Sequence, residues 1–307
     1  MTQRVRRYVR RAANAYRITA TLPDKRRSLP RWLAFELLRA LTPLASVEGD
    51  GIRYVVRTQD RGVSRMTYIT GHYDLDVMED AVARLQRLLG RDVLRGRTFV
   101  DVGANVGTTS IPAVRRFGAA RSVAFEPAED NFRILSANVA LNDLADRIDA
   151  RQVGVSDAPG RALLELAPRN SGDHRVRTGA AAGAFDAYHE SRRPTAEVQL
   201  VRLDDALEEL GVEIADVGLL WIDTQGHEGH VLAGASRLLA AGVPVVCEYW
   251  PYGLRRAGGL ERFNATVATA FSEVVDARAG DPLPASRVAE LEDRYTGERY
   301  SDLILVP

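Results

Sequence analysis

The segment Thr98–Gly107, with the sequence T-F-V-D-V-G-A-N-V-G, constrains the fold of this 307-residue chain more than any other segment. An apolar run ends at Asp101 and is followed at once by a turn that contains Gly103 and Gly107. Residues 108–117 can then continue as a helix. A strand, a glycine-rich loop and a helix start, in this order, are typical of the ligand-binding corner of a parallel α/β sheet. The segment therefore predicts a doubly wound α/β domain.

The chain after this segment alternates between strand-like and helix-like patterns, which supports that prediction. We expect core strands at 98–102, 122–126, 147–155, 218–223, 243–249, 271–277 and 301–306, and helices at 108–117, 129–141, 228–241 and 259–270. Two further strands are expected at 161–166 and 196–203. The last two core strands have no long helix between them, which suits an antiparallel edge. The predicted fold is a doubly wound, seven-stranded, mostly parallel, Rossmann-like sheet with an antiparallel edge strand.

The residues before this sheet predict a helical and hairpin extension. Residues 49–58 and 63–70 alternate like the two strands of a hairpin around Asp60–Gly62, and Asp76–Leu89 has helical spacing. We therefore divide the chain into a basic arm with an amphipathic helix (1–48), a hairpin and helix (49–97) and a catalytic domain (98–307). Within that domain, residues 168–194 are too long for an ordinary connection. They are expected to form a substrate loop, with a disordered insertion as the alternative.

The glycine spacing indicates which ligand the first corner binds. Asn105 replaces the second glycine of G-x-G-x-x-G, so the close approach to a pyrophosphate is lost and a dinucleotide is disfavoured. The carboxylate of Asp101 suits a cation, such as the amino group of S-adenosylmethionine (SAM). Glu126, in V-A-F-E-P, ends the next apolar run at the distance expected for a contact to ribose hydroxyls. Together these features predict a SAM site.

A second cluster, L-L-W-I-D-T-Q-G-H-E-G-H, places Asp223 at the end of another apolar strand. The carboxyl ends of parallel strands meet at one crevice, so Asp223 and Glu248 are expected near Asp101 and Glu126. Asp223, His227 or Glu228 would accept the proton of an attacking hydroxyl; a surface position at a helix start is the alternative for the histidine.

No metal is expected at this cluster. The string H-E-G-H lacks the H-E-x-x-H spacing of zinc proteases. A divalent cation held by Asp223, Glu248 and a substrate oxygen is the alternative.

Other segments predict the walls of the site. Val153–Val155 end the third strand, and Gly154 and Val155 are expected to lie against the adenine. Tyr249, Trp250 and Tyr252 either line a substrate pocket or pack in the core.

Charge is unevenly distributed although the net charge is zero. Residues 1–31 hold ten basic residues and a single acid, Asp24. The arm is therefore either a solvated tail or a contact for an anionic partner such as a membrane surface. Trp32–Leu41 is apolar on more than one helical face but too short to span a bilayer. We expect it to dock on the catalytic domain, with a position on a membrane surface as the alternative. Cys247 is the only cysteine, which excludes an internal disulfide and favours a cytoplasmic protein.

Several strings, in order, resemble the FkbM family of SAM-dependent methyltransferases: F-V-D-V-G-A-N-V-G, A-F-E-P, N-V-A-L-N, V-R-L-D-D, W-I-D-T-Q-G-H-E, V-L-A-G-A and V-V-C-E, within residues 98–250. The resemblance implies the class I methyltransferase fold. Carried over by position, it assigns Asp101, Gly103, Asn105 and Gly107 to the methionine-side loop, Glu126 to the ribose and Asp223 to the methyl donor and acceptor. The neighbouring residues Ala104, Pro127, Gly154 and Val155 complete the predicted SAM contacts, and Asp223, His227 and Glu228 are the predicted catalytic residues. Thr224 and Gln225 depart from the commoner family string I-D-V-E-G-x-E.

The resemblance implies methyl transfer to a hydroxyl of a sugar, glycan or secondary metabolite, with S-adenosylhomocysteine (SAH) as the product. We expect no nucleic-acid partner. Two alternatives remain: a SAM-binding scaffold without catalysis, and a membrane-surface enzyme that acts on a lipid-linked glycan. A nicotinamide dehydrogenase is the least favoured.

Overall fold

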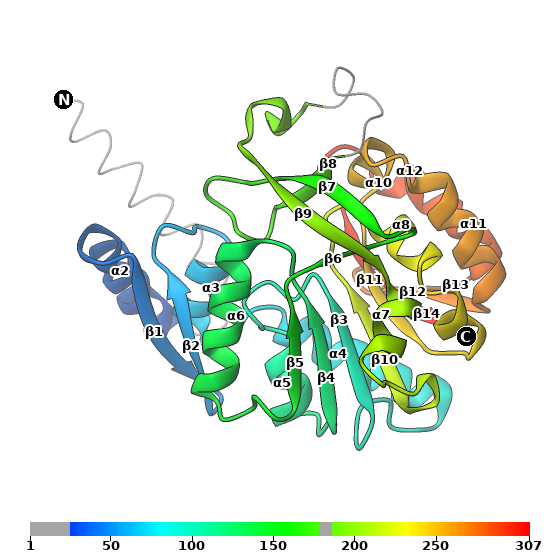
Figure 1. Cartoon of the computed structure of the whole chain (residues 1–307), viewed down its shortest axis with the longest axis horizontal. Helices are drawn as coiled ribbons and strands as arrows, with labels where there is room; N and C mark the ends of the chain where they lie inside the picture. Colours follow the sequence, from blue (N-terminus) through cyan, green and yellow to red (C-terminus); the bar gives the residue numbers. More distant parts are fainter. Residues whose placement is uncertain (1–24, 178–185) are drawn as a thin grey trace. The chain divides into compact units, whose positions relative to one another are not determined.

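The computed structural model describes residues 25–177 and 186–307 of the chain. The chain divides into two compact units, Met1–Tyr73 and Asp74–Pro307 (Figure 1). The first 24 residues of the basic arm, and residues 178–185 of the expected substrate loop, lie outside the described residues. Within the described ranges, no helix is long and apolar enough to cross a membrane.

The first unit contains two helices and a hairpin: α2 (Lys25–Leu41), β1 (Leu44–Gly49), β2 (Ile52–Arg57) and α3 (Val63–Thr70). The two strands are antiparallel, and Gly49 pairs with Ile52 across a two-residue turn. One face of α2 packs inside this unit, because Trp32 and Phe35 are buried and the Phe35 ring lies 5.4 Å from that of Tyr68.

The expected hairpin around Asp60–Gly62 is wrong. Residues 63–70 form helix α3, and the true hairpin lies earlier in the chain, between Leu44 and Arg57. The reason is local: the Asp60 carboxylate accepts hydrogen bonds from the backbone N–H groups of Gly62 and Ser64, both at 2.8 Å. A carboxylate that satisfies free N–H groups at this point stabilises the start of a helix.

The second unit is built on an eight-stranded sheet with the order β13-β12-β14-β11-β10-β3-β4-β5. Its strands are β3 (Thr98–Val102), β4 (Arg121–Phe125), β5 (Ile148–Arg151), β10 (Val217–Ile222), β11 (Val245–Tyr249), β12 (Glu273–Asp276), β13 (Pro282–Pro284) and β14 (Ser301–Val306). The five strands from β11 to β5 are parallel. The doubly wound fold is thus confirmed. The antiparallel strand β14 lies inside the sheet, between β11 and β12, and the β12–β13 pair forms the edge.

Helices cover both faces of this sheet (Figure 1). They are α4 (Leu75–Leu89), α5 (Ser110–Arg115), α6 (Glu129–Leu141), α7 (Leu203–Glu209), α8 (Glu228–Ala233), α9 (Ser236–Ala240), α10 (Pro251–Arg256), α11 (Leu260–Ala270) and α12 (Leu291–Arg294), with 3₁₀ turns η1 (Glu190–Arg192), η2 (Ile214–Asp216) and η3 (Ala285–Glu290). The helix expected over 228–241 is divided at Gly234, where a β-carbon would lie 2.1 Å from the carbonyl oxygen of Ser156. The chain turns there because two backbone segments touch.

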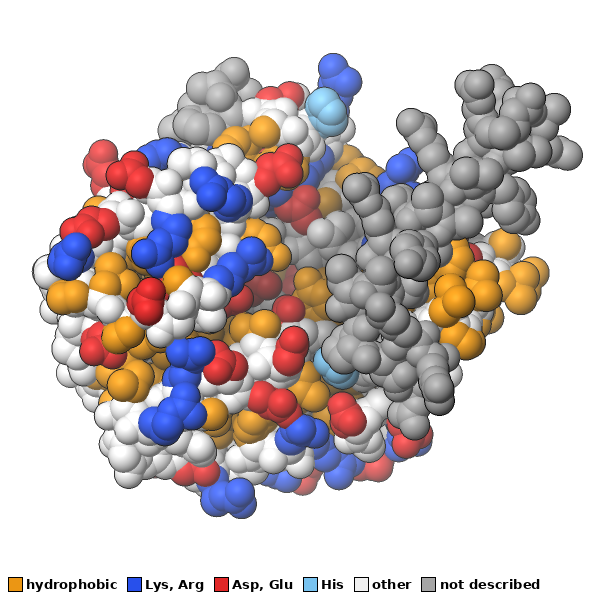
Figure 2. Space-filling model, turned by 180° about the vertical axis from the view of Figure 1, so that it is seen from behind, with side chains coloured by type: hydrophobic (Ala, Val, Ile, Leu, Met, Phe, Trp, Pro, Cys, Tyr) orange, Lys and Arg blue, Asp and Glu red, His pale blue; other side chains and the backbone are white. Residues whose placement is uncertain are grey.

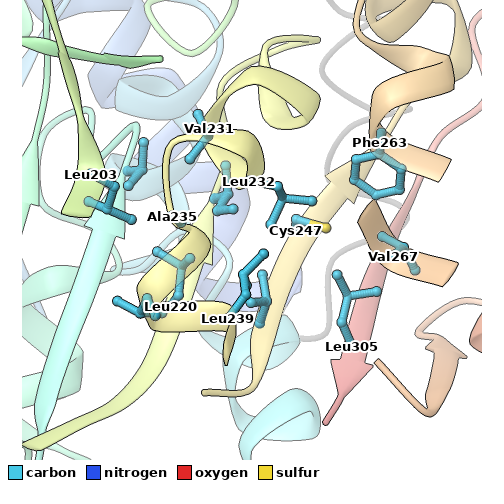
Figure 3. Packing of buried hydrophobic residues seen from close by; sticks show 14 of the residues in the cluster. Leu203, Leu220, Val231, Leu232, Ala235, Leu239, Cys247, Phe263, Val267 and Leu305 are labelled. Carbon is cyan, nitrogen blue, oxygen red and sulfur yellow. The ribbon is translucent and has the colours of Figure 1, made fainter. Parts of the chain in front are cut away.

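The main core lies between the sheet and the helices that follow β9, β10 and β11. Leu220 and Cys247 from the sheet meet Leu232 and Leu239 from α8 and α9, and Phe263 from α11 packs beside them (Figure 3). All six residues of β10 are buried, which is expected for a central strand covered on both faces.

A smaller sheet lies beyond the ends of the parallel strands β3, β4 and β5 (Figure 1). Its order is β6-β9-β7-β8, with β6 (Gly154–Ser156), β7 (Gly160–Glu165), β8 (Arg175–Arg177) and β9 (Thr195–Arg202). The single strand expected over 147–155 is therefore two strands, β5 and β6, in two different sheets. The described residues between β7 and β9, 166–177 and 186–194, form what we call the covering layer; four of them, between Ser171 and Val176, line the crevice at the edge of the large sheet.

Candidate active site

The loop after β3 brings two strand ends into direct contact. Gly103 has φ +93°, and a β-carbon on it would lie 1.8 Å from the carbonyl oxygen of Asp223. Only glycine fits this position. The N–H groups of Gly103 and Ala104 donate to the carbonyl of Phe125 at 2.9 and 3.0 Å, so they bind the neighbouring strand. The loop is thus fixed by backbone geometry.

Asp101 lies beneath this loop and does not line the cavity. Its Oδ2 accepts hydrogen bonds from the hydroxyls of Thr109, at 2.6 Å, and Ser110. Burial raises the pKa of Asp101 to about 6, although these hydroxyls oppose the rise. Oδ1 has no hydrogen-bond partner among the described residues. Asp101 therefore ties the loop to the start of α5. Gly107, also predicted as a contact, lies outside the cavity lining, near Ile111 and Leu135.

Glu126 follows β4 and lines the cavity with Pro127. Its two carboxylate oxygens accept hydrogen bonds from the N–H groups of Asn105, at 2.9 Å, and Ala128, at 2.8 Å. Burial raises the pKa of Glu126 to about 8, and these two N–H donors oppose the rise. The carboxylate is held at a fixed position at the cavity wall.

The cavity measures about 560 Å³ and lies where β3, β4 and β10 end. It brings together eight of the predicted residues: Gly103, Asn105, Glu126, Pro127, Gly154, Val155, Asp223 and His227. Its remaining lining residues are Val102, Phe125, Asn131, Val153, Leu164, Ser171, Gly172, His174, Val176, Thr224 and Gln225. The lining combines an apolar wall with polar groups of both kinds, which suits a nucleoside.

The first part of the expected substrate loop, residues 171–176, forms a strap that closes one side of this cavity. Ser171, Gly172, His174 and Val176 all line it. The carbonyl of Ser171 accepts a hydrogen bond from the Asn105 side chain at 3.1 Å and another from the Asn131 side chain at 3.0 Å. Asn131 is buried on α6, five positions after Glu126, and this closeness in sequence was the only feature that could have pointed to it.

Asp223 and Gln225 form the other end of the site, at the end of β10. Gln225 has φ +55°, which is unusual for a residue with a side chain. Its Nε2 donates to Oδ1 of Asp223 at 2.8 Å and to Oε2 of Glu248 at 2.9 Å. Burial raises the pKa of Asp223 to about 6 and that of Glu248 well above its usual range. One amide therefore joins two carboxylates at the mouth of the crevice.

Two further carboxyl groups lie near this pair. Burial, followed by the charge of Asp223, raises the pKa of Asp302 to about 6 and that of Asp74 well above its usual range. Across residues 25–177 and 186–307, no group of three or more His, Cys, Asp or Glu side chains is arranged to hold a metal ion.

Glu228, a predicted catalytic residue, is fully buried and does not line the cavity. Its Oε1 accepts hydrogen bonds from the N–H and the hydroxyl of Thr224, both at 2.9 Å, and its Oε2 accepts from the N–H of Gly226 at 3.0 Å. Burial raises the pKa of Glu228 to about 7. The carboxylate therefore holds the turn between β10 and α8.

His227 lines the cavity and is bound to the end of β6. Its Nε2 lies 2.9 Å from the hydroxyl of Ser156, which donates to Asp157 at 3.0 Å. Since that hydroxyl has one hydrogen, it accepts from His227, which places the imidazole proton on Nε2. Nδ1 has no partner among the described residues. Burial, and then the stacked ring of His230 4.3 Å away, lowers the pKa of His227 to about 3.

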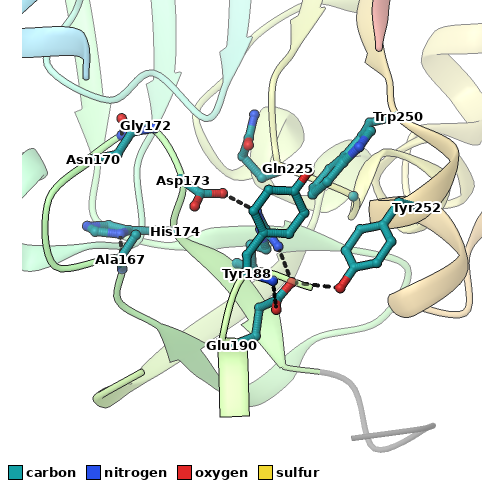
Figure 4. Close-up of polar contacts among 12 residues, drawn as sticks. Ala167, Asn170, Gly172, Asp173, His174, Tyr188, Glu190, Gln225, Trp250 and Tyr252 are labelled. Atoms are coloured by element: carbon teal, nitrogen blue, oxygen red, sulfur yellow. Dashed lines mark hydrogen bonds and ion pairs between the residues drawn. The ribbon is translucent and has the colours of Figure 1, made fainter. Parts of the chain in front are cut away.

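An aromatic cluster lies near Gln225, beyond the cavity lining (Figure 4). The ring of Tyr188 lies 5.3 Å from Trp250 and 5.4 Å from Tyr252, and Figure 4 shows Gln225 beside them. Arg175, nearly fully buried, lies over the rings of Tyr188 and Trp250, at 4.9 and 4.5 Å from their centroids. Trp250 and Tyr252 thus belong to this cluster.

Glu190 connects the cluster to the covering layer. It accepts hydrogen bonds from Arg175 at 2.5 Å, from the hydroxyl of Tyr252 at 3.1 Å and from the N–H of Tyr188 at 2.8 Å. The described part of the expected substrate loop is therefore anchored to α10. Tyr249, by contrast, packs in the core against Phe263.

Comparison with known proteins gives the family. A model of the family described as Methyltransferase FkbM domain matches residues 101–256. The chain is 33% identical over 178 residues to Methyltransferase sdnD of Sordaria araneosa, and the match covers 51% of this chain and 68% of that protein. It is 33% identical over 164 residues to 31-O-demethyl-FK506 methyltransferase FkbM of Streptomyces tacrolimicus, which covers 47% of this chain and 62% of that protein.

The crystal structure of Methyltransferase FkbM from Methylobacillus flagellatus KT is 16% identical to this chain, with a TM-score of 0.39. The match covers 78% of this chain and 52% of that one. The chain thus spans about half of this solved structure, and 62% of the Streptomyces relative. The family match includes the loop after β3, Glu126, Asp223 and α10, and the resemblance seen in the sequence is confirmed. On these findings, the chain belongs to the FkbM family of SAM-dependent methyltransferases.

Proposed function

We propose that the chain transfers the methyl group of SAM to a hydroxyl oxygen of a sugar, glycan or secondary metabolite. The observation that carries this proposal is the cavity that runs between two carboxylates, Glu126 and Asp223. The carboxylate at one end can accept hydrogen bonds from ribose hydroxyls of SAM. The carboxylate at the other end can accept the proton of the acceptor hydroxyl that attacks the methyl group. The printed name of the Streptomyces relative, which refers to a 31-O-demethyl compound, supports an oxygen acceptor.

In this proposal Glu126 accepts hydrogen bonds from the ribose hydroxyls. Its rigid position between the N–H groups of Asn105 and Ala128 supports that role. The apolar residues Val153, Val155 and Leu164 would enclose the base, and the strap that begins at Ser171 would exclude water. SAM, when bound, supplies a methyl group on a sulfonium, and the carbon–sulfur bond breaks as the new carbon–oxygen bond forms.

Asp223 is the base in this proposal. Its pKa of about 6 lies near physiological pH, which favours proton transfer without loss of the ionised form at pH 7. The substrate hydroxyl would give its proton to this carboxylate and then to solvent. His227, with a pKa of about 3, is a weaker base. The Glu228 carboxylate already accepts hydrogen bonds from the turn between β10 and α8. They act here as positioning residues, His227 at the cavity wall and Glu228 beneath it.

Titration calorimetry with SAH, together with transfer of a labelled methyl group to a panel of hydroxylated and aminated acceptors, tests this function. We expect micromolar SAH binding and transfer to hydroxyl acceptors that falls as pH drops through about 6. Asp223→Asn should retain SAH binding and lose transfer ~10²–10⁴-fold, as expected for removal of a general base. Asp216→Asn, an exposed residue before β10, is the control. Absence of SAH binding by folded protein, or transfer to amines alone, would contradict the proposal.

A further inference from the structure

Helix α2 has a second apolar face that nothing in the described first unit covers. Its four leucines, Leu29, Leu33, Leu37 and Leu41, follow one another at intervals of four residues. Their side chains are 46%, 56%, 62% and 71% exposed. Figure 2 shows hydrophobic side chains gathered on α2, at the right of that view. We call this group the leucine face.

The leucine face lies opposite the buried side of the helix. At 100° per residue, Trp32 and Phe35 point to one side, into the first unit, and the four leucines point to the other. Within residues 28–41, whose side chains the structure describes, the other residues on the leucine side are Pro30, Ala34 and Ala40. Glu36 lies at its border and forms an ion pair with Arg39 at 3.1 Å. A folded helix seldom exposes so continuous an apolar face without a partner.

The charge of the adjoining sequence indicates which partner fits. Residues 1–31 carry ten basic residues and one acid, so the leucine face directly follows a strongly cationic stretch of sequence. A second copy of the chain would bring two such stretches together and be repelled. An anionic lipid surface attracts the basic residues and accepts the leucines. At 17 residues the helix is ~25 Å long, and it would lie in the plane of the surface.

We propose that the leucine face of α2 docks this protein on the surface of an anionic phospholipid bilayer. The leucines insert among the upper acyl chains, and the positive charge of the sequence 1–31 attracts the anionic headgroups. This inference goes beyond the transfer reaction, and it does not depend on the methyl acceptor.

Co-sedimentation of the full chain with vesicles tests the proposal. We expect binding to vesicles of phosphatidylglycerol and phosphatidylcholine, and weaker binding to phosphatidylcholine alone or at high salt. The double variant Leu33→Ser/Leu37→Ser should bind the anionic vesicles ~30-fold more weakly, because two inserted side chains are lost. Leu88→Ser, which changes a leucine of α4 that is 47% exposed, should bind like the wild type.

The controls make every outcome decisive. Thermal melts of the double variant should match the wild type, because both leucines are exposed. No binding of the wild type to anionic vesicles would overturn the proposal, and so would equal binding by the double variant. If sedimentation velocity instead shows a dimer that the double variant converts to a monomer, the leucine face joins two copies, and the membrane proposal is wrong.

Discussion

The two sides of the crevice differ in the contacts that hold them. We call them the donor side, where SAM is proposed to bind, and the acceptor side, where the methyl acceptor is proposed to bind. On the donor side, backbone groups fix the loops after β3 and β4: Gly103 and Ala104 bind Phe125, and Asn105 binds Glu126. On the acceptor side, side chains far apart in sequence join the covering layer to α10. Arg256, for example, forms an ion pair with Glu165 at 2.8 Å across 91 positions.

Under the proposed assignment, this difference predicts that the donor side tolerates fewer substitutions than the acceptor side. A site made by backbone geometry tolerates few substitutions, because a β-carbon in the wrong place moves a strand end. A site made by ion pairs and rings can be altered one side chain at a time. The two sides should therefore respond differently to mutation.

The largest effect is expected at Gly103. A β-carbon there would overlap the carbonyl of Asp223 at 1.8 Å, so Gly103→Val should destabilise the protein by ~5 kcal/mol or more and abolish SAH binding. Thermal unfolding and calorimetry measure both. The control is Gly160→Val on β7, where a β-carbon meets nothing within 4 Å. Wild-type stability in the Gly103 variant would show that the donor loop is adaptable after all.

The next effect should be confined to the acceptor side. Arg175→Met leaves the buried Glu190 carboxylate without its closest cation and should cost ~3 kcal/mol. Hydrogen exchange of residues 186–193 should accelerate, because Glu190 anchors this segment. SAH affinity should change by less than ~3-fold, since the Arg175 side chain contacts Glu190 and the Tyr188 and Trp250 rings and does not line the cavity. An equal loss in both measurements would mean that the two sides are a single structural unit.

Glu126→Gln should affect the donor side without unfolding it. The amide keeps the size of the side chain but loses a charged acceptor, which is expected to weaken SAH binding by ~1.5–3 kcal/mol. In the wild type, SAH affinity should rise with pH through about 8, because only the ionised form accepts from both hydroxyls. The variant should lose this rise. Glu129→Gln, on the exposed start of α6, should retain it.

The donor side of the site could be predicted from the sequence better than the acceptor side. The loop at Gly103 and the carboxylate of Glu126 were recognisable because each role depends on neighbours along the chain. The loop 168–194 was recognisable from its length, but the contacts of Ser171 and the pairing of Arg175 with Glu190 join distant segments, which no local pattern records. Helix α3 was missed for another reason: eight residues that alternate in polarity fit either structure, and the Asp60 carboxylate decided between them.

The smallest effect links the two sides, through the strap. Asn105 and Asn131 donate to the same carbonyl of Ser171, so each alone should contribute ~1 kcal/mol to its closure. Asn131→Ala should therefore speed SAH dissociation ~5-fold in stopped-flow experiments, with little change in thermal stability. Because the two amides share one acceptor, Asn105→Ala/Asn131→Ala should exceed the sum of the single changes. If the effects of the two single changes on the SAH dissociation rate simply add, the two amides do not share the task of holding the strap. The strap would then be held by the small sheet, and the acceptor side would close the donor cavity without help from these amides.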